Sequence, residues 1–208
     1  MNGNGFTLIE LMVIIAIIAI GTSIALPSYN ASVANAKVQG TAESILAGLR
    51  DARSSAIQRN APVRFQLVTT LDNNCAFSTT SAEWVTTETD QNQIGNPIGA
   101  CAMGPWSPNY PCVDASVHLC VSDPFIISKS STRPESGVVV AADNPLVVFS
   151  PLGIPTPDAL TGQAASTSQI TVTSTLSGTR SLRVKIDPTT GSVKLCNLGA
   201  TAGSANGC

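Results

Sequence analysis

Ionisable side chains are scarce in this chain of 208 residues. Asp, Glu, Lys and Arg make up 12% of it, there is one histidine, and the formal net charge at pH 7 is −2. A charge balance so close to neutral gives no general attraction to nucleic acid or to anionic lipid. No Ser–His–Asp set, paired catalytic carboxylates or phosphate-binding loop stands out. We therefore expect no enzyme, and no metal or other cofactor.

Charge is sparsest near the N-terminus, where one carboxylate interrupts an apolar run. Residues 6–26 are almost wholly apolar, and Glu10 is their only ionisable side chain. As a helix, this run would be roughly 30 Å long, which is enough to cross a bilayer core. A carboxylate inside such a segment is costly. Glu10 is therefore predicted to have a partner or a function.

The residues on either side of the apolar run argue against a secretory signal peptide, which is the first of three interpretations of this run. A secretory signal peptide would have a basic start and a small-residue cleavage site. Residues 1–5 contain no Lys or Arg, and Pro27-Ser28-Tyr29 follows the run. A plain transmembrane anchor fits the length but leaves Glu10 without a role.

The third interpretation rests on the string Gly5-Phe6-Thr7-Leu8-Ile9-Glu10-Leu11, which resembles the class III signal of type IV pilins and type II secretion pseudopilins. The resemblance implies that a prepilin peptidase cleaves after Gly5 and methylates the new amino terminus at Phe6. It also implies that Glu10 pairs with the Phe6 amine of a neighbouring subunit, which would neutralise two costly charges. Residues 1–5 would be a cleaved leader, neutral here although usually basic in the family, and residues 6–27 a transmembrane and filament-core helix.

The six cysteines all follow the apolar run, and in an exported chain an even number of cysteines predicts disulfides. They are Cys75, Cys101, Cys112, Cys120, Cys196 and Cys208. No C-x2-C pair is present, which argues against a metal site, and the lone His118 is interpreted as structural. The connectivity is open, since six cysteines allow about 15 pairings. The one pairing that we expect is Cys196 with Cys208, the only cysteines after residue 120.

Hydrophobic periodicity predicts a long helix followed by a β-rich head. One apolar stripe has spacings of three and four: Val38, Ala42, Ile45, Leu49, Ala52 and Ala56. Residues 28–60 should therefore be the amphipathic half of a helix that is broken at Pro27. Residues 61–208 should form the head, with strands at residues 63–69, 137–141, 146–149 and 169–173 and a closing hairpin of residues 181–186 and 192–195.

Residues 72–124 are poorly patterned, and we expect a long loop region or weak strands held by disulfides. The predicted fold class is α+β, with a pilin-like long N-terminal helix packed against an antiparallel sheet. Trp84, Trp106 and Tyr110 could anchor an interface or fill the core near the disulfides.

Two further stretches resemble the FimT, FimU and GspH group of minor subunits. Residues 49–63 resemble the helix end and first strand of that group, and residues 148–153 with the late hairpin resemble its C-terminal half. The resemblance implies a minor type IV pilin in assembly initiation or at the pilus tip, or alternatively a GspH-like minor pseudopilin of type II secretion. Either would associate with other subunits through the N-terminal helix. It would span the inner membrane once, with its head in the periplasm, before entering a pilus or pseudopilus.

Some FimT-like members bind DNA through a Gly-Arg-x-Arg motif in the last strands. The matching positions here are Gly191-Ser192-Val193-Lys194, where the first arginine is absent and the second is lysine. Arg183 and Lys185 share one strand face, and we expect Lys194 and Arg180 beside them. Such a patch could contact DNA phosphates, as in a subunit for natural transformation, or could be the solvated face of a hairpin.

Overall fold

The computed structural model describes residues 7–89, 97–102, 126–131, 135–158, 167–201, 204 and 207–208. Its first element is α1 (Leu8–Arg59), a single helix of 52 residues. A capping box with Glu10 closes its first turn, and Thr7 is the N-cap. At the other end, Asn60 adopts the left-handed conformation with φ 51°, and its N–H bonds back to the carbonyl of Ala56.

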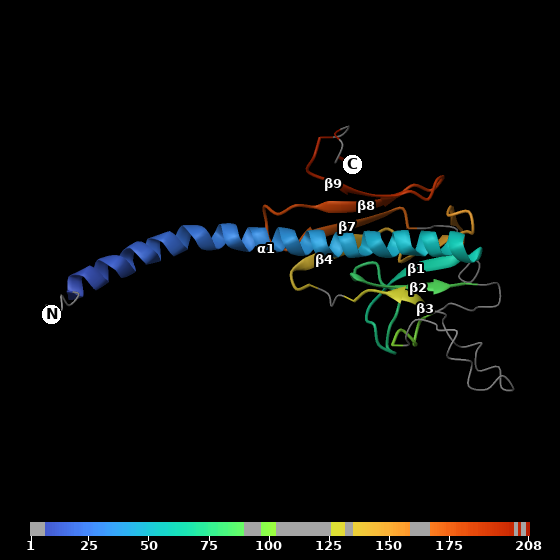
Figure 1. Cartoon of the computed structure of the whole chain (residues 1–208), viewed down its shortest axis with the longest axis horizontal. Helices are drawn as coiled ribbons and strands as arrows, with labels where there is room; N and C mark the ends of the chain where they lie inside the picture. The colour runs from blue at the N-terminus through green and yellow to red at the C-terminus, as the bar shows by residue number, and fades with distance from the viewer. Residues whose placement is uncertain are drawn as a thin grey trace, which may run out of the picture.

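The expected break at Pro27 is wrong, because α1 passes through this position without interruption. The helix instead follows a smooth curve along its N-terminal part (Figure 1). Proline removes one backbone hydrogen bond, and a long helix can absorb that loss by bending instead of ending. The apolar half and the amphipathic half are therefore one continuous helix.

Nine strands of the described chain form two antiparallel sheets beside the C-terminal part of α1. Sheet A has the order β3-β2-β1-β5-β6 and sheet B the order β4-β7-β8-β9. Sheet A consists of β1 (Val63–Val68), β2 (Glu83–Glu88), β3 (Ile126–Lys129), β5 (Leu146–Phe149) and β6 (Pro155–Thr156). Sheet B consists of β4 (Val138–Ala142), β7 (Gln169–Ser174), β8 (Leu182–Ile186) and β9 (Val193–Asn197). In Figure 1, β1 to β3 lie below α1 and β7 to β9 above it.

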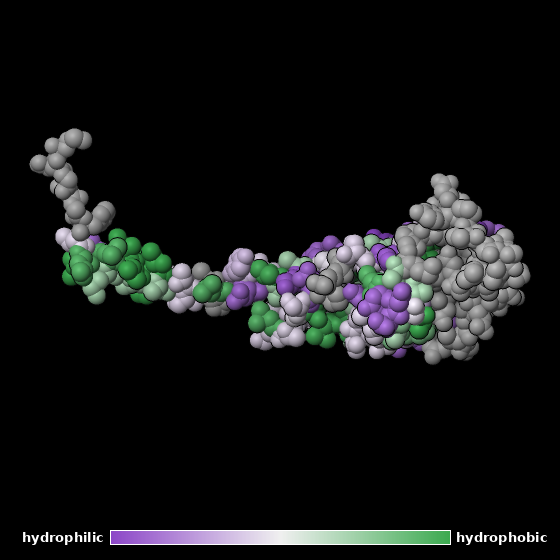
Figure 2. All heavy atoms as spheres, turned by 90° about the horizontal axis from the view of Figure 1, so that it is seen from below, coloured by the Kyte–Doolittle hydropathy of each residue, from purple (hydrophilic) through white to green (hydrophobic). Residues whose placement is uncertain are grey.

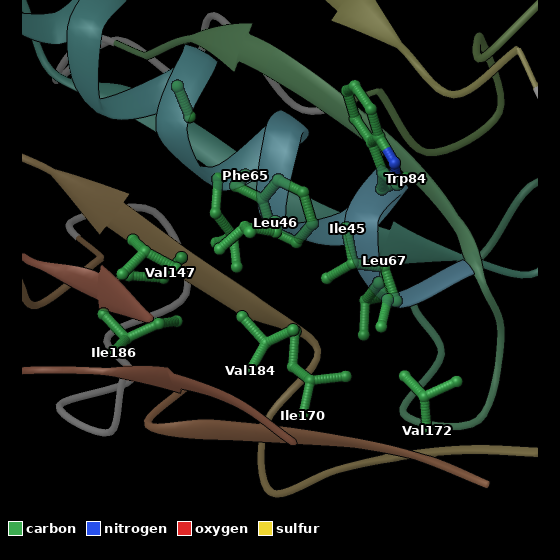
Figure 3. Close-up of a cluster of buried hydrophobic side chains, with 14 of the residues drawn as sticks. Ile45, Leu46, Phe65, Leu67, Trp84, Val147, Ile170, Val172, Val184 and Ile186 are labelled. Carbon is green, nitrogen blue, oxygen red and sulfur yellow. The ribbon is translucent and has the colours of Figure 1, made fainter. Parts of the chain in front are cut away.

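The core lies between α1 and the two sheets. The predicted helix stripe is confirmed, since all six of its residues, from Val38 to Ala56, are fully buried. Figure 3 shows Ile45 and Leu46 of α1 gathered with side chains from both sheets. Each fully buried aliphatic side chain of this kind contributes about 1.5–3 kcal/mol. One helix face therefore holds both sheets in place.

The predicted strands β1 and β5 are present and buried throughout, and side chains alternate between core and solvent in the predicted strands β7 and β8. β2 was not predicted as a defined strand, because it lies in the poorly patterned stretch 72–124. All but its last residue are buried. α1 packs on one side of sheet A, and a small cluster around the Cys75–Cys101 disulfide packs on the other. A strand covered on both faces need not alternate in its sequence.

Trp84 on β2 is a core residue, but it lies in the main core against α1 and not in the cluster around the Cys75–Cys101 disulfide. Its ring packs against α1 at Gly48, where an added Cβ would come within 2.7 Å of the ring. Its indole N–H donates to the hydroxyl of Ser44 at 3.2 Å. The ring of Phe65 lies beside it, with centroids 5.7 Å apart. The other two aromatic candidates, Trp106 and Tyr110, lie outside the described residues, as does His118.

Two disulfides tie described parts of the head together. Cys75 is joined to Cys101, and Cys196 to Cys208, which is the pairing expected from their isolation near the C-terminus. Cys112 and Cys120 lie outside the described residues. A buried ion pair on the outer side of sheet A adds a further link, with Arg64 Nη2 2.6 Å from Asp158 Oδ1.

Candidate functional site

The N-terminal half of α1 presents an uncovered apolar surface. Every side chain from Leu8 to Ser23 is exposed, and so is Leu26. The most apolar 18-residue window of α1 has a mean hydropathy of 2.5, and none of it is buried by the rest of the chain. On the face seen in Figure 2, hydrophobic atoms cover most of this end of the helix, away from the head. By length and composition, α1 can cross a membrane.

Glu10 lies at the start of this surface and is held by Thr7. Its Oε2 accepts hydrogen bonds from the Thr7 N–H and the Thr7 hydroxyl, both at 3.0 Å. The N–H of Glu10 donates in return to the Thr7 hydroxyl at 3.4 Å. Gly5 and Phe6 lie outside the described residues, so the pairing of Glu10 with a neighbouring amine stays a prediction. What the geometry provides is a carboxylate held in a fixed place, at the positive end of the helix dipole.

Three of the four predicted basic residues lie together on the outer face of sheet B. Lys185 and Lys194 are directly opposite each other on β8 and β9, and Arg183 is opposite Cys196. Arg183 Nε donates to the Thr171 hydroxyl at 3.4 Å. Like charges placed opposite each other on neighbouring strands repel. In the described strands of sheet B, no outward-facing position carries an acidic residue that would offset this repulsion.

Arg180, the fourth predicted residue, lies elsewhere. Its backbone N–H donates to Asn35 Oδ1 at 2.7 Å, and its Nη1 is 3.5 Å from Gln39 Oε1. Both partners are on α1, so this guanidinium group lies against the helix and not on the outer face of sheet B. The expected patch is therefore smaller by one cation.

Gly191, the glycine of the Gly-Arg-x-Arg comparison, has a packing role in this head. Its φ is 65°, and a Cβ added to it would lie 1.9 Å from the carbonyl oxygen of Gly153. That carbonyl accepts a hydrogen bond from Arg53 Nε at 3.0 Å, and Arg53 Nη2 donates to the carbonyl of Thr190 at 3.1 Å. Arg53 of α1 thus joins the β5–β6 turn of sheet A to the β8–β9 turn of sheet B. No local pattern in the sequence indicates this role, since it depends on two turns that meet only in the fold.

A membrane-length apolar helix with a glutamate in its first turn, continued into a helix that packs on antiparallel sheets, defines the class of pilins and pseudopilins. Residues 1–26 match the family model described as the prokaryotic N-terminal methylation motif. Residues 41–191 match the model described as type II transport protein GspH, and the chain belongs to this GspH family. The family assignment made from the sequence is confirmed.

Two solved structures of the type IV minor pilin FimU from Pseudomonas aeruginosa also resemble the chain. One has a TM-score of 0.45 and 12% identity, and covers 77% of this chain and 88% of that chain. The other has a TM-score of 0.37 and 13% identity, and covers 76% of this chain and 90% of that chain. At these values we draw no functional conclusion from the likeness. No curated protein matches the chain.

The family determines the broad class of function. The chain is a minor pilin or pseudopilin, and this family is one of structural proteins and not of enzymes. Membership implies assembly with other pilin subunits, and the methylation motif implies processing by a prepilin peptidase. The apolar helix and this motif together indicate a membrane-anchored protein.

Proposed function

We propose that this chain is a minor type IV pilin that acts in starting filament assembly or at the filament tip. The observation that carries the proposal is the uncovered apolar half of α1, from Leu8 to Leu26. An apolar surface of this size needs a cover. Lipid provides it before assembly, and the helices of neighbouring subunits provide it afterwards. The head needs no such partner for its own fold, because its core is complete around the other half of α1.

Within this proposal, residues 1–5 are the leader, and Phe6 becomes the methylated amino terminus. Glu10 then acts between subunits. In the apolar surroundings of a bilayer or a filament core, a carboxylate and an amine are each costly alone, and a close pair offsets much of that cost. Because Thr7 already orients the Glu10 carboxylate, little side-chain freedom remains to be lost when the neighbouring amine arrives.

A second candidate is a minor pseudopilin of the type II secretion system. It is favoured by the family model that matches residues 41–191, which is described as a type II transport protein. The uncovered helix and the prepilin-type N-terminus are compatible with both a type IV pilus and a type II secretion pseudopilus, so they do not distinguish the two candidates. The two candidates differ in which process fails when the subunit is missing.

Deletion of the gene in its native host distinguishes these candidates. A minor pilin predicts few or no surface pili and normal release of secreted proteins, with both states restored by the wild-type gene. The opposite pattern would establish the pseudopilin. The wild-type protein should also appear in filaments sheared from the cell surface. Two results together would contradict both candidates. The deletion strain would have normal pili and normal secretion, and the protein would be absent from filaments sheared from wild-type cells.

A third candidate, a pilus subunit that binds DNA, is supported by Lys185, Lys194 and Arg183 on the outer face of sheet B. Cations that contact phosphates give binding that weakens steeply with salt and ignores sequence. The test is the affinity of the full chain in detergent micelles for duplex DNA at two salt concentrations. Arg183→Glu combined with Lys185→Glu should abolish binding, and Arg180→Glu, which lies against α1, should leave it unchanged. Absence of binding at low salt would rule this candidate out.

A further inference from the structure

The uncharged part of α1 is longer than the hydrocarbon core of a bilayer. After Glu10, no Asp, Glu, Lys or Arg follows until Lys37. As a helix, residues 11–36 are about 39 Å long, whereas the hydrocarbon core is about 30 Å thick and each headgroup layer about 5–8 Å. A core that starts between Leu8 and Glu10 is crossed by about 20 residues and so ends at about residue 27 to 30. The helix therefore stays uncharged through the core and through one headgroup layer.

The head begins at the level of this headgroup layer. The β7–β8 turn, residues 175–181, lies at the end of the head that faces the N-terminal half of α1 (Figure 1). Leu176 of this turn lines a shared hollow with Asn30 and Val33 of α1. Val33 is about 5–9 Å beyond the end of the hydrocarbon core. Leu176 is therefore placed among the headgroups when α1 crosses a membrane.

Three apolar side chains are exposed at this level, and we call them the base surface. They are Tyr29, Val33 and Leu176, with exposed fractions of 67%, 36% and 42%. Tyr29 precedes Val33 by four positions, so the two lie on the same face of α1. Tyrosine is typical of the membrane–water interface, because its ring is apolar and its hydroxyl can stay hydrated. The base surface thus has the composition of an interfacial contact.

The β7–β8 turn holds Leu176 in a fixed position and keeps charge away from it. The Thr175 N–H donates to the carbonyl of Gly137 at 2.9 Å, and the Thr179 hydroxyl donates to the carbonyl of Leu176 at 2.7 Å. The one charged residue of the turn is Arg180, whose guanidinium group lies against α1 at Gln39, farther from the membrane-crossing residues. Little conformational freedom and no charge solvation would be lost if Leu176 entered a headgroup layer.

We propose that the base surface contacts the lipid headgroups of the bilayer before assembly, with Tyr29 and Leu176 inserted among them. Lipid is the occupant because the base surface continues directly from the membrane-crossing part of α1, with no charge between them. With Leu176 as a second point of contact beside α1, the head has a fixed orientation on the membrane. The proposal rests on the membrane-anchored state alone, so it applies to a pilin and to a pseudopilin, and its test needs no filament.

The test measures tryptophan fluorescence of the full chain in phosphatidylcholine vesicles. A fraction of the lipids carries a nitroxide quencher on the headgroup. Ser177→Trp places the probe on an exposed position next to Leu176, and the emission of the wild-type protein is subtracted. Leu152→Trp is the matched control, because Leu152 is 78% exposed but precedes Gly153, which lies against Ile57 near the other end of the head. The nitroxide should quench Ser177→Trp at least about twofold more than Leu152→Trp.

A second pair of variants tests whether Leu176 makes the contact. Adding Leu176→Asp to Ser177→Trp should lower the quenching to the level of Leu152→Trp, because a carboxylate stays in water. Adding Leu152→Asp to Ser177→Trp should leave the quenching unchanged. Flotation of each variant with the vesicles measures anchoring by α1, so a loss of anchoring is detected separately from a loss of the head contact.

Three results would overturn the proposal. The first is equal quenching of Ser177→Trp and Leu152→Trp in protein that floats with the vesicles. The second is quenching of Ser177→Trp that Leu176→Asp does not reduce. The third is shielding of Ser177→Trp from iodide in the water that increases with the protein-to-lipid ratio and occurs without quenching by the nitroxide lipid. That third result would show instead that another copy of the chain covers the base surface.

Discussion

Glu10 closes the first turn of its own helix before any neighbour is present. Its Oε2 accepts two hydrogen bonds from Thr7, so the side chain has a local structural role in addition to the proposed pairing between subunits. A glutamine at this position would keep the capping box, because Gln can serve there as Glu does, but it would remove the charge. The capping role and the pairing role can therefore be separated by substitution.

Gly191 provides a prediction about the meeting of the two sheets. Gly191→Ala should lower the free energy of unfolding by about 2–4 kcal/mol, because it adds a steric overlap with the Gly153 carbonyl to the cost of a left-handed residue. Gly178 is the matched control, since its φ of 80° is also positive but a Cβ there meets nothing within 4 Å. Gly178→Ala should cost only about 1 kcal/mol. Equal losses in denaturant unfolding of the full chain would show that Gly191 is kept for backbone conformation alone.

The β8–β9 hairpin depends on a turn that Asp187 organises. Its Oδ1 accepts hydrogen bonds from the Thr189 hydroxyl and from the N–H groups of Thr189 and Thr190. The Thr189 hydroxyl and then these backbone donors stabilise the charged form, and they hold the pKa of Asp187 well below its usual range. The same turn positions Gly191 against Gly153.

This lowered pKa makes the hairpin sensitive to acid. A carboxylate whose pKa is depressed by folding contributes stability above its unfolded pKa of about 4 and loses it as the pH falls toward the folded value. The difference in Tm between wild type and Asp187→Asn should therefore be constant at neutral pH and should shrink below about pH 4. Thr189→Val, which removes the hydroxyl donor, should reduce the acid dependence of wild type. A difference that does not vary with pH would contradict this role for Asp187.

The elements that could be predicted carry a regular apolar pattern in the sequence, and they include β1 and β5, which are buried throughout. The stripe from Val38 to Ala56 and the alternating strands of sheet B carried their periodicity in the sequence, because one side of each meets solvent. β2 could not be located in this way, because it lies in a stretch of the sequence without a regular apolar pattern. The prediction of a helix break at Pro27 was wrong, because local propensity does not determine whether a long helix bends or ends at a proline.

The residues of the candidate site also differ in whether a local pattern in the sequence reveals them. Glu10 was found because a lone charge in an apolar run is visible in the sequence. Arg53, which joins two turns that are far apart in the chain, carries no such local signal. Arg180 was placed wrongly because its contacts are with α1, about 140 positions earlier, and no local pattern reports such a contact.

The whole molecule consists of one helix shared by two environments. One face of its C-terminal half is buried by the head, and its N-terminal half is exposed and apolar (Figures 1 and 2). A helix without a break connects the two halves, so that the position of the first determines where the head is displayed. A filament subunit requires both a helix segment that contacts other subunits and a segment that carries the head. The start of α1 is therefore the place where the proposed contact between subunits can be tested.

The central claim is that the charge of Glu10 acts between subunits. The measurement is the amount of each variant in filaments sheared from cells, relative to the amount in the membrane fraction. Glu10→Gln and Glu10→Ala should be present in the membrane at wild-type levels and absent from sheared filaments. Thr7→Ala, which breaks the capping box at a cost of about 1 kcal/mol but keeps the carboxylate, should still assemble. Normal incorporation of Glu10→Gln would contradict the pairing and leave Glu10 as a helix cap.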